Sequence, residues 1–212
     1  LCLEPRSMRT PKVREVGEAL RSLFSRPYTV QYPYKPIVPP ERFRGKAKFF
    51  EDGCIACGAC AQVCPARAID VENVVPENGT AVRKMTVHQD HCIFCGQCQR
   101  FCTTQEGIKL TGDFETGTYD RSTSVSTVEK ELVVCRECGE VIATVDQIRW
   151  VAEKVGPKAF GNMSLALVLS TDLGLADDVS RAPGRAVDRG DRVSFLCPRC
   201  RREIILYEQW GP

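Results

Sequence analysis

The sequence is poor in several residue types that would point to common functions. It contains only two histidines and two tryptophans, and 29 lysines and arginines against 27 aspartates and glutamates leave a net charge of +2. So small a charge argues against a protein that binds nucleic acid through bulk electrostatics, and we expect no nucleic-acid partner. The sequence contains no acid–base pair, Ser–His–Asp set, P-loop or dinucleotide fingerprint. We therefore expect no catalytic site of its own in the chain.

Long apolar runs are missing as well. The longest, MSLALVL at residues 163–169, is far shorter than the ~20 residues that cross a bilayer as a helix. The first residues are charged and contain no continuous apolar core, unlike a secretory signal. These two features predict a soluble chain.

Cysteine, in contrast, is abundant. The sequence has 13 cysteines, an odd number, and all except Cys2 belong to closely spaced C-x2-C groupings. Neighbouring thiols of this kind hold metals more readily than they form disulfides between distant strands. We expect a metal-binding protein in a reducing compartment.

A sequence repeat contains eight of the cysteines. CIACGACAQVCPARAI (residues 54–69) aligns with CIFCGQCQRFCTTQEGI (residues 92–108), cysteine on cysteine. In a run C-x2-C-x2-C-x3-C, three thiolates converge on one cluster and the fourth projects toward the neighbouring cluster. The doubled run is typical of two [4Fe–4S] clusters that exchange their fourth ligands. Buried apolar cysteines and a pair of zinc sites are the alternatives.

The predicted ligands form two sets, each with its fourth member from the other run. The set for cluster 1 consists of Cys54, Cys57, Cys60 and Cys102. The set for cluster 2 consists of Cys92, Cys95, Cys98 and Cys64.

One position distinguishes the two runs. Pro65 follows the first run, as such runs usually require, whereas Thr103 follows the second. Proline fixes φ at this position but donates no ligand, so threonine should not abolish cluster binding. The N–H group of Thr103 becomes a candidate hydrogen-bond donor near a cluster sulfur. We expect this residue to tune stability or reduction potential.

The remaining four cysteines form a separate pair of C-x2-C groups, CRECGE and CPRCRR. Four thiolates in this arrangement surround a zinc ion tetrahedrally, and they predict a zinc site at Cys135, Cys138, Cys197 and Cys200. A rubredoxin-like iron site and unligated surface cysteines are the alternatives.

Several segments around these motifs have recognisable patterns. TPKVREVGEALRSLF predicts an amphipathic helix with Thr10 as N-cap and Pro11 at its first position. The proline-rich stretch that follows predicts an extended strap. AIDVENVV and TAVRKMTV predict a β-hairpin around PENG. Thr144 and Gln147 form a capping box for the helix VDQIRWVAEKV, and residues 171–192 predict a mobile loop.

These patterns predict an α+β chain of four parts. Residues 1–47 form the N-terminal helix and strap, and residues 48–115 form a domain that resembles bacterial-type ferredoxins with two [4Fe–4S] clusters. Residues 116–130 form a linker rich in serine and threonine. Residues 131–212 form a domain similar to a zinc ribbon, with the helix inserted.

The sequence around the runs resembles a more specific family. YPYKPIVPPERFRGK before the first run and HCIFCGQC in the second resemble the eight-iron subunit shared by complex I and membrane-bound [NiFe] hydrogenases. The resemblance covers residues 10 to about 115. It implies an N-terminal helix at the membrane surface, a peripheral position on the cytoplasmic side of the cell membrane, and clusters at the end of an electron wire.

The four-cysteine tail separates the subfamilies. A ferredoxin pair followed by such a tail is similar to the electron-transfer subunit of formate hydrogenlyase, whereas complex I subunits usually lack it. The resemblance implies, as partners, hydrogenase small and large subunits, membrane-arm subunits, and an electron-donating dehydrogenase or ferredoxin. A complex I-type subunit with quinone as the downstream acceptor, and a structural adaptor with non-cycling clusters, are the alternatives.

Overall fold

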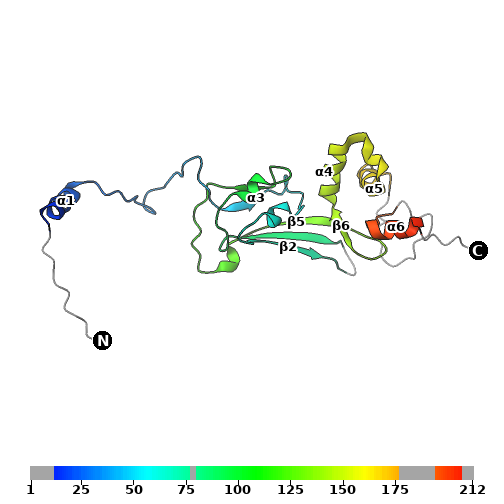
Figure 1. Cartoon of the computed structure of the whole chain (residues 1–212), viewed down its shortest axis with the longest axis horizontal. Coiled ribbons are helices and arrows are strands. Elements are labelled where there is room, and N and C mark those ends of the chain that lie inside the picture. The colour runs from blue at the N-terminus through cyan, green and yellow to red at the C-terminus, as the bar shows by residue number, and fades with distance from the viewer. Residues whose placement is uncertain (1–11, 77–79, 177–193, 207–212) are drawn as a thin grey trace, which may run out of the picture. The chain divides into compact units, whose positions relative to one another are not determined.

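A computed structural model describes residues 12–76, 80–176 and 194–206 (Figure 1). The chain divides into two compact units, residues 1–40 and residues 41–212. Thr10, Pro11, Cys2 and residues 177–192 of the expected loop lie outside the described residues.

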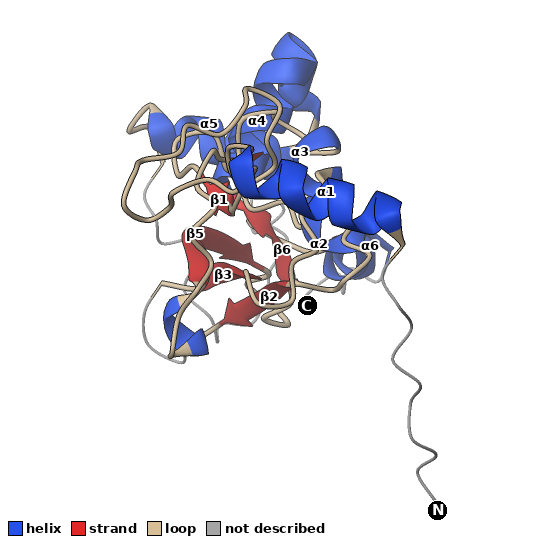
Figure 2. Ribbon diagram, turned by 90° about the vertical axis from the view of Figure 1, so that its left-hand side faces the viewer, coloured by secondary structure: helices blue, strands red, loops and turns tan. Residues whose placement is uncertain are grey.

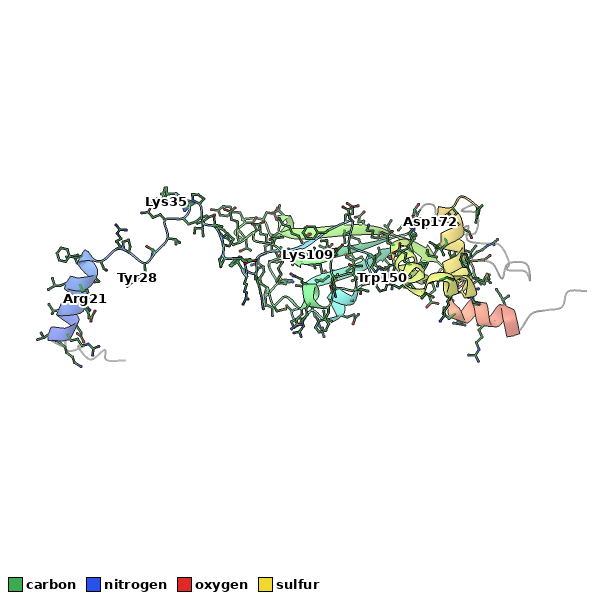
Figure 3. All side chains as sticks on the ribbon, turned by 90° about the horizontal axis from the view of Figure 1, so that it is seen from above. Arg21, Tyr28, Lys35, Lys109, Trp150 and Asp172 are labelled. Carbon is green, nitrogen blue, oxygen red and sulfur yellow. The ribbon has the colours of Figure 1, made fainter. Side chains whose placement is uncertain are left out.

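The first unit contains one helix. Helix α1 spans Val13–Phe24, and the carboxylate of Glu15 accepts a hydrogen bond from the backbone N–H of Lys12, the N-cap residue, at 3.3 Å. None of the residues of α1 is buried, and its predicted apolar stripe is exposed at Val13, Val16, Leu20 and Leu23. Residues 25–40 contain neither helix nor strand, in agreement with the predicted strap, and Tyr28 is fully exposed (Figure 3).

The second unit is built on a four-stranded antiparallel sheet with the strand order β2-β3-β5-β6 (Figure 2). Strand β2 spans Ile69–Val74 and strand β3 spans Val82–His88, and Ile69 lies opposite Val87. The predicted hairpin is therefore confirmed. The alternation of apolar and polar residues in β3 buries Met85 and Val87 on one face of the sheet.

A second, smaller sheet pairs the segment before the first cysteine repeat with the segment at the end of the second repeat. Strand β1 (Ala47–Phe49) pairs antiparallel with β4 (Ile108–Leu110), and each repeat contributes one short helix, α2 (Ala59–Gln62) or α3 (Gln97–Arg100). Strand β1 was not predicted, because only three residues at the end of the proline-rich segment form it. The buried core joins cysteines of both runs to Met85, Ile108 and Val128.

The structure differs from the predicted linker at residues 116–130. Strand β5 spans Val125–Val134, pairing with β3 from Val125 opposite His88 to Glu131 opposite Val82. Its last residues pair with β6 (Val141–Thr144). Only the first part of the segment, which includes the short 3₁₀ helix η1 (Arg121–Thr123), lies outside the sheet. Serine and threonine are as suited to a half-exposed strand as to a linker, which explains the wrong assignment.

The last part of the chain packs three helices against the end of this sheet. Helix α4 spans Val145–Val155 and is followed by η2 (Gly156–Gly161), α5 (Met163–Asp172) and α6 (Pro198–Leu206). The side chain of Thr144 accepts from the N–H of Gln147 at 3.2 Å, which is the N-cap half of the predicted capping box, and Gly156 ends α4 with φ of +64°. Thr171 and Asp172 belong to α5 rather than to the expected loop.

A second apolar core lies between these helices and the sheet. It contains Val133 of β5, Ile148 of α4, Val168 of α5 and Phe195. None of the helices among the described residues is long and apolar enough to cross a membrane.

Candidate metal centres

The two cysteine repeats fold with the same backbone. Each repeat has three residues with positive φ, and the equivalent residues are 38 positions apart in the sequence. The pairs are Ala56 and Phe94 (+47° and +53°), Gly58 and Gly96 (+81° and +78°), and Arg67 and Gln105 (+49° and +63°). The first two pairs turn the chain sharply between cysteines, so that the first three sulfurs of each run face one cavity, and the third pair follows the last cysteine of each run.

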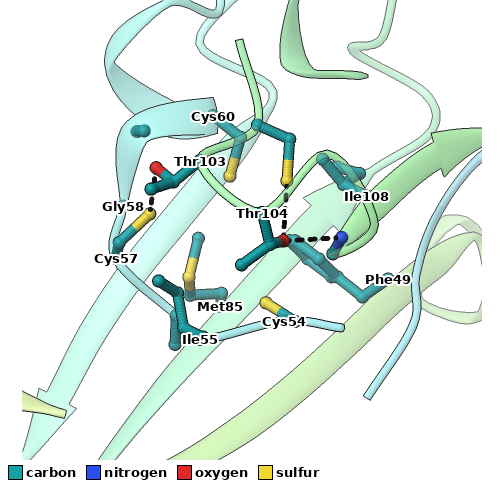
Figure 4. A pocket seen from close by; sticks show the side chains of 14 residues that line it. Phe49, Cys54, Ile55, Cys57, Gly58, Cys60, Met85, Thr103, Thr104 and Ile108 are labelled. Carbon is teal, nitrogen blue, oxygen red and sulfur yellow. Dashed lines mark hydrogen bonds between the residues drawn. The ribbon is translucent and has the colours of Figure 1, made fainter. Parts of the chain in front are cut away.

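The first cavity has a volume of ≈ 290 Å³ and takes its wall from both repeats (Figure 4). Its sulfur-bearing residues are Cys54, Cys57, Cys60 and Cys102. Apolar side chains of Phe49, Met85 and Ile108 form much of the remaining wall. The structure thus brings Cys102 of the second run to the three leading cysteines of the first run.

The second cavity, of ≈ 360 Å³, is the counterpart of the first. Its sulfur-bearing residues are Cys64, Cys92, Cys95 and Cys98. Cys64 of the first run lies here with three cysteines of the second run. Both cysteine sets therefore meet in the combinations that the sequence analysis predicted, while ligation by each sulfur stays a prediction.

The chemistry of both cavities suits a positively charged, sulfur-binding group. Burial raises the pKa of Cys60 to about 12 and that of Cys98 to about 11. An apolar cage disfavours bare thiolates, and iron ions offset that cost by supplying positive charge next to the sulfurs. Four cysteines in a small apolar cavity are the ligand set of a [4Fe–4S] cluster, so the residues present fit this group.

Hydrogen bonds reach several of the sulfurs. The hydroxyl oxygen of Thr103 lies 3.1 Å from the sulfur of Cys57, and that of Thr104 lies 3.4 Å from the sulfur of Cys102. In the second cavity the backbone N–H of Ala68 donates to the sulfur of Cys64 at 3.3 Å. The sequence analysis named the N–H of Thr103 as the candidate donor, whereas the contact in the structure is made by its hydroxyl.

Cys102 differs electrostatically from the buried cysteines. Burial alone would raise the pKa of its thiol, but hydrogen bonds from the loop that follows it, among them those of the backbone N–H groups of Thr104, Gly107 and Ile108, outweigh burial. The pKa of Cys102 is therefore below its usual value. The loop that follows the second run stabilises the thiolate form that binds metal.

The four-cysteine group at the end of β5 forms a third site. The sulfurs of Cys135, Cys138, Cys197 and Cys200 all lie within 4.8 Å of one another, and those of Cys138 and Cys197 are 3.7 Å apart. Tetrahedral zinc with Zn–S bonds of ~2.3 Å places its sulfurs about 3.8 Å apart. The spacing therefore fits one mononuclear, four-coordinate ion.

A long-range hydrogen bond joins the halves of this site. Cys135 follows β5, whereas Cys197 and Cys200 lie at the start of α6, and the N–H of Arg136 donates to the carbonyl of Phe195 at 2.9 Å. Burial works against ionisation of Cys135, but N–H groups of Cys138, Cys197 and Glu137 lower its pKa to about 7. One thiol of the site thus ionises readily, which favours metal uptake.

Each of the first two cavities has one edge that faces an open groove. A groove of ≈ 890 Å³ beside Cys57 is lined in part by Arg83, Gln147 and Trp150. A groove of ≈ 990 Å³ beside Cys95 is lined in part by Arg42, Arg44 and Arg100. These grooves could not be predicted from the sequence, because their residues come from separate segments with no shared motif.

An arginine holds the loop at each of these grooves. The guanidinium of Arg83 donates to the carbonyl of Ala56 at 3.1 Å, and that of Arg44 donates to the carbonyl of Cys95 at 3.1 Å. Both arginines therefore place positive charge close to a cysteine set.

Comparison with known sequences agrees with this geometry. Residues 53–105 match the family described as the 4Fe-4S dicluster domain, and this range contains all eight cysteines of the two cavities. Residues 53–105 are a 4Fe–4S dicluster domain. The dicluster domain carries two [4Fe–4S] clusters, whereas the four-cysteine site lies beyond the matched residues.

Curated relatives extend the similarity beyond the dicluster domain. NAD(P)H-quinone oxidoreductase subunit I of Picosynechococcus sp. is 41% identical over 114 residues, which cover 50% of this chain and 55% of that protein. The corresponding subunit of Rippkaea orientalis is 42% identical over 114 residues, covering 50% and 58%. The chain spans a little over half the length of these relatives.

One solved structure is similar to the chain in part. It is described as the membrane-bound sulfane sulfur reductase, an archaeal respiratory membrane complex. The match is 27% identical and covers 58% of this chain and 65% of that chain, with a TM-score of 0.39. That TM-score is too low to carry an argument about the fold.

Proposed function

We propose that the chain is an iron–sulfur electron-transfer subunit of a membrane-bound oxidoreductase complex related to complex I. The observation that carries the proposal is the pair of cavities in the dicluster domain, each lined by three cysteines of one run and the fourth of the other. The similarity to subunit I of quinone oxidoreductases supports the choice of complex.

The residues of the chain bind and insulate two redox centres. When bound, [4Fe–4S] clusters accept and release single electrons. Cys54, Cys57, Cys60 and Cys102 hold cluster 1, and Cys92, Cys95, Cys98 and Cys64 hold cluster 2. Apolar wall residues such as Met85 and Val87 exclude water, and the exposed edges at Cys57 and Cys95 give neighbouring proteins access to the two centres.

The relatives favour complex I over hydrogenase as the nearest type of complex. The four-cysteine tail of the sequence favoured the hydrogenase. The two relatives reverse that ranking, because both are named as quinone oxidoreductase subunits. The hydrogenase remains a second candidate, since the compact four-cysteine site is the feature on which that similarity rests.

The four-cysteine site has a structural role in this proposal. Zinc fits the spacing of the sulfurs, has no redox chemistry, and fastens β5 to α6. Helix α1 lies at the cytoplasmic surface of the membrane, where its exposed apolar stripe is covered by lipid.

Metal analysis and redox titration test the proposal. Anaerobically purified protein should contain about eight iron atoms and about one zinc ion per chain, and both iron centres should cycle in an EPR-monitored titration. Centres that never change oxidation state across the physiological range would instead indicate the structural adaptor. Co-purification then separates the complexes: a quinone-site subunit without nickel ligands indicates the complex I type, and a nickel-binding large subunit indicates the hydrogenase.

A further inference from the structure

The two cluster cavities are equivalent in backbone but not in the side chains that meet their sulfurs. Positions 38 residues apart are equivalent, so Thr103 and Thr104 correspond to Pro65 and Ala66. The first cavity is lined by both threonines. The residues that line the second cavity are cysteines, one glycine and apolar side chains, without a hydroxyl group among them.

Of the two threonines, Thr103 is the one free to donate to a sulfur. The hydroxyl of Thr104 donates its single proton to the carbonyl of Gly53 at 2.7 Å and accepts from the N–H of Gly107 at 3.2 Å. Within the described parts of the chain, the hydroxyl of Thr103 has one hydrogen-bond partner, the sulfur of Cys57 at 3.1 Å. A metal-bound cysteine has no proton, so this hydroxyl must be the donor.

A hydrogen bond of this kind changes the reduction potential of the cluster it touches. The reduced cluster carries one more negative charge than the oxidised cluster, and part of that charge resides on the cysteine sulfurs. A donor at a sulfur therefore stabilises the reduced form more than the oxidised form. Pro65 has no side-chain donor, so the second cavity lacks the equivalent interaction.

We propose that the hydroxyl of Thr103 raises the reduction potential of cluster 1 above the value it would have with proline at this position, and so makes the two clusters unequal. This inference rests on the proposed two-cluster function. Thr103 is a positioning residue that acts through Cys57. The donor shifts the electron distribution toward cluster 1, next to the groove lined by Arg83 and Trp150.

The variants follow from the equivalence of the two runs. Thr103→Val removes the hydroxyl, keeps the shape and leaves no space for a water molecule to replace the donor. Thr103→Ser keeps the hydroxyl and is the matched control. Pro65→Thr introduces the same side chain beside the other cluster, where it should face Cys95, the equivalent of Cys57.

The experiment is an EPR-monitored redox titration of the full, anaerobically purified chain, with iron counted in each sample. The cluster 1 signal is assigned as the one lost in Cys57→Ser. Thr103→Val should shift the midpoint of cluster 1 to a more negative potential and leave cluster 2 unchanged. Thr103→Ser should stay close to the parent, and Pro65→Thr should shift cluster 2 to a more positive potential.

Pulsed EPR in D₂O gives a second readout that a purely structural role would not move. One exchangeable-proton coupling to cluster 1 should be present in the parent and in Thr103→Ser and lost in Thr103→Val, while the couplings of the backbone N–H groups at Cys102 remain in all three. Unchanged midpoints and an unchanged coupling in Thr103→Val would overturn the inference. If that variant does not assemble, a cluster 2 midpoint in Pro65→Thr equal to the parent's overturns it. A parent with fewer than two iron–sulfur clusters would contradict the proposed function instead.

Discussion

The dicluster domain and the four-cysteine site both gather cysteines, but they do so over very different distances in the sequence. In the dicluster domain three of the four cysteines at each cavity lie within seven consecutive residues, and the left-handed residues between them set their direction. In the four-cysteine site, residues 139–196 separate the two halves, and β5, α4, α5 and α6 must all be in place before the sulfurs meet.

This difference indicates what each metal contributes to folding. A contiguous run already restricts its cysteines to a small volume, so a cluster mainly completes a local structure. The metal of the four-cysteine site closes a long loop and fixes α6 against β5, and loop closure of this kind costs conformational entropy. We therefore expect removal of the metal from the four-cysteine site to destabilise residues 131–212 more than the dicluster domain.

The largest expected effect comes from removing the distant half of the four-cysteine site. Cys197→Ser combined with Cys200→Ser should abolish zinc binding, which supplies on the order of 10 kcal/mol in small zinc domains. Residues 131–212 should then become sensitive to limited proteolysis, while both EPR signals of the dicluster domain persist. Zinc content, proteolysis and EPR of the same sample measure the effect.

Cys2→Ser is the matched control, because Cys2 is the one cysteine outside all three groups in the sequence. It should leave zinc content and proteolysis unchanged. An intact tail in the double variant, together with loss of a redox-active signal, would show that the site holds electron-carrying iron and that the comparison with the dicluster domain is wrong.

The next largest effect tests whether each cluster takes all four of its cysteines from one run. Cys64 belongs to the first run but lines the second cavity. Cys64→Ser should therefore damage the cluster associated with Cys92, Cys95 and Cys98 and leave the other cluster intact. EPR and iron content should show loss of one cluster signal, while zinc stays at about one per chain.

Cys102→Ser provides the reciprocal variant and should damage the cluster associated with Cys54, Cys57 and Cys60. If each serine variant lost the cluster of its own run, the exchange of fourth ligands would be wrong. Each run would then be an independent unit, and the contrast with the four-cysteine site would become sharper.

The sequence predicted local features well and long-range ones poorly, for physical reasons. The hairpin, helix α4 with its caps, and the combinations of cysteines all follow from short patterns with a fixed geometry. Strand β5 was missed because its identity depends on a partner, β3, that lies more than thirty residues earlier in the chain. The grooves beside Cys57 and Cys95 were missed because side chains from separate segments create them.

The sequence predicted the four cysteines of the third site but not the structure that surrounds them. Nothing in CRECGE or CPRCRR indicates that Phe195 is buried in the core with Val133 and Val168. The contact between the tail and the first cluster loop was also missed, because it is made by a residue that the sequence identified only as a helix cap. That residue is Thr144.

Thr144 is fully buried where the two regions meet. Its hydroxyl donates to the carbonyl of Ile55 in the first cluster loop at 2.6 Å and accepts from the N–H of Gln147 at the start of α4 at 3.2 Å. Among the described residues, no hydrogen bond joins α4 to the second cluster loop. Through its N-cap, α4 is therefore hydrogen-bonded to the first of the two cluster loops.

The smallest expected effect comes from breaking this coupling with Thr144→Val. The variant removes a helix cap and leaves the carbonyl of the half-buried Ile55 without its donor, so we expect a loss of about 2 kcal/mol in the free energy of unfolding. Thr144→Ser keeps the hydroxyl and should lose much less. Because Ile55 lies between Cys54 and Cys57, oxygen should destroy cluster 1 faster in Thr144→Val than in the parent, with cluster 2 unaffected. Equal rates of loss for both clusters, followed by EPR after controlled air exposure, would mean that the tail does not support the first cluster loop selectively.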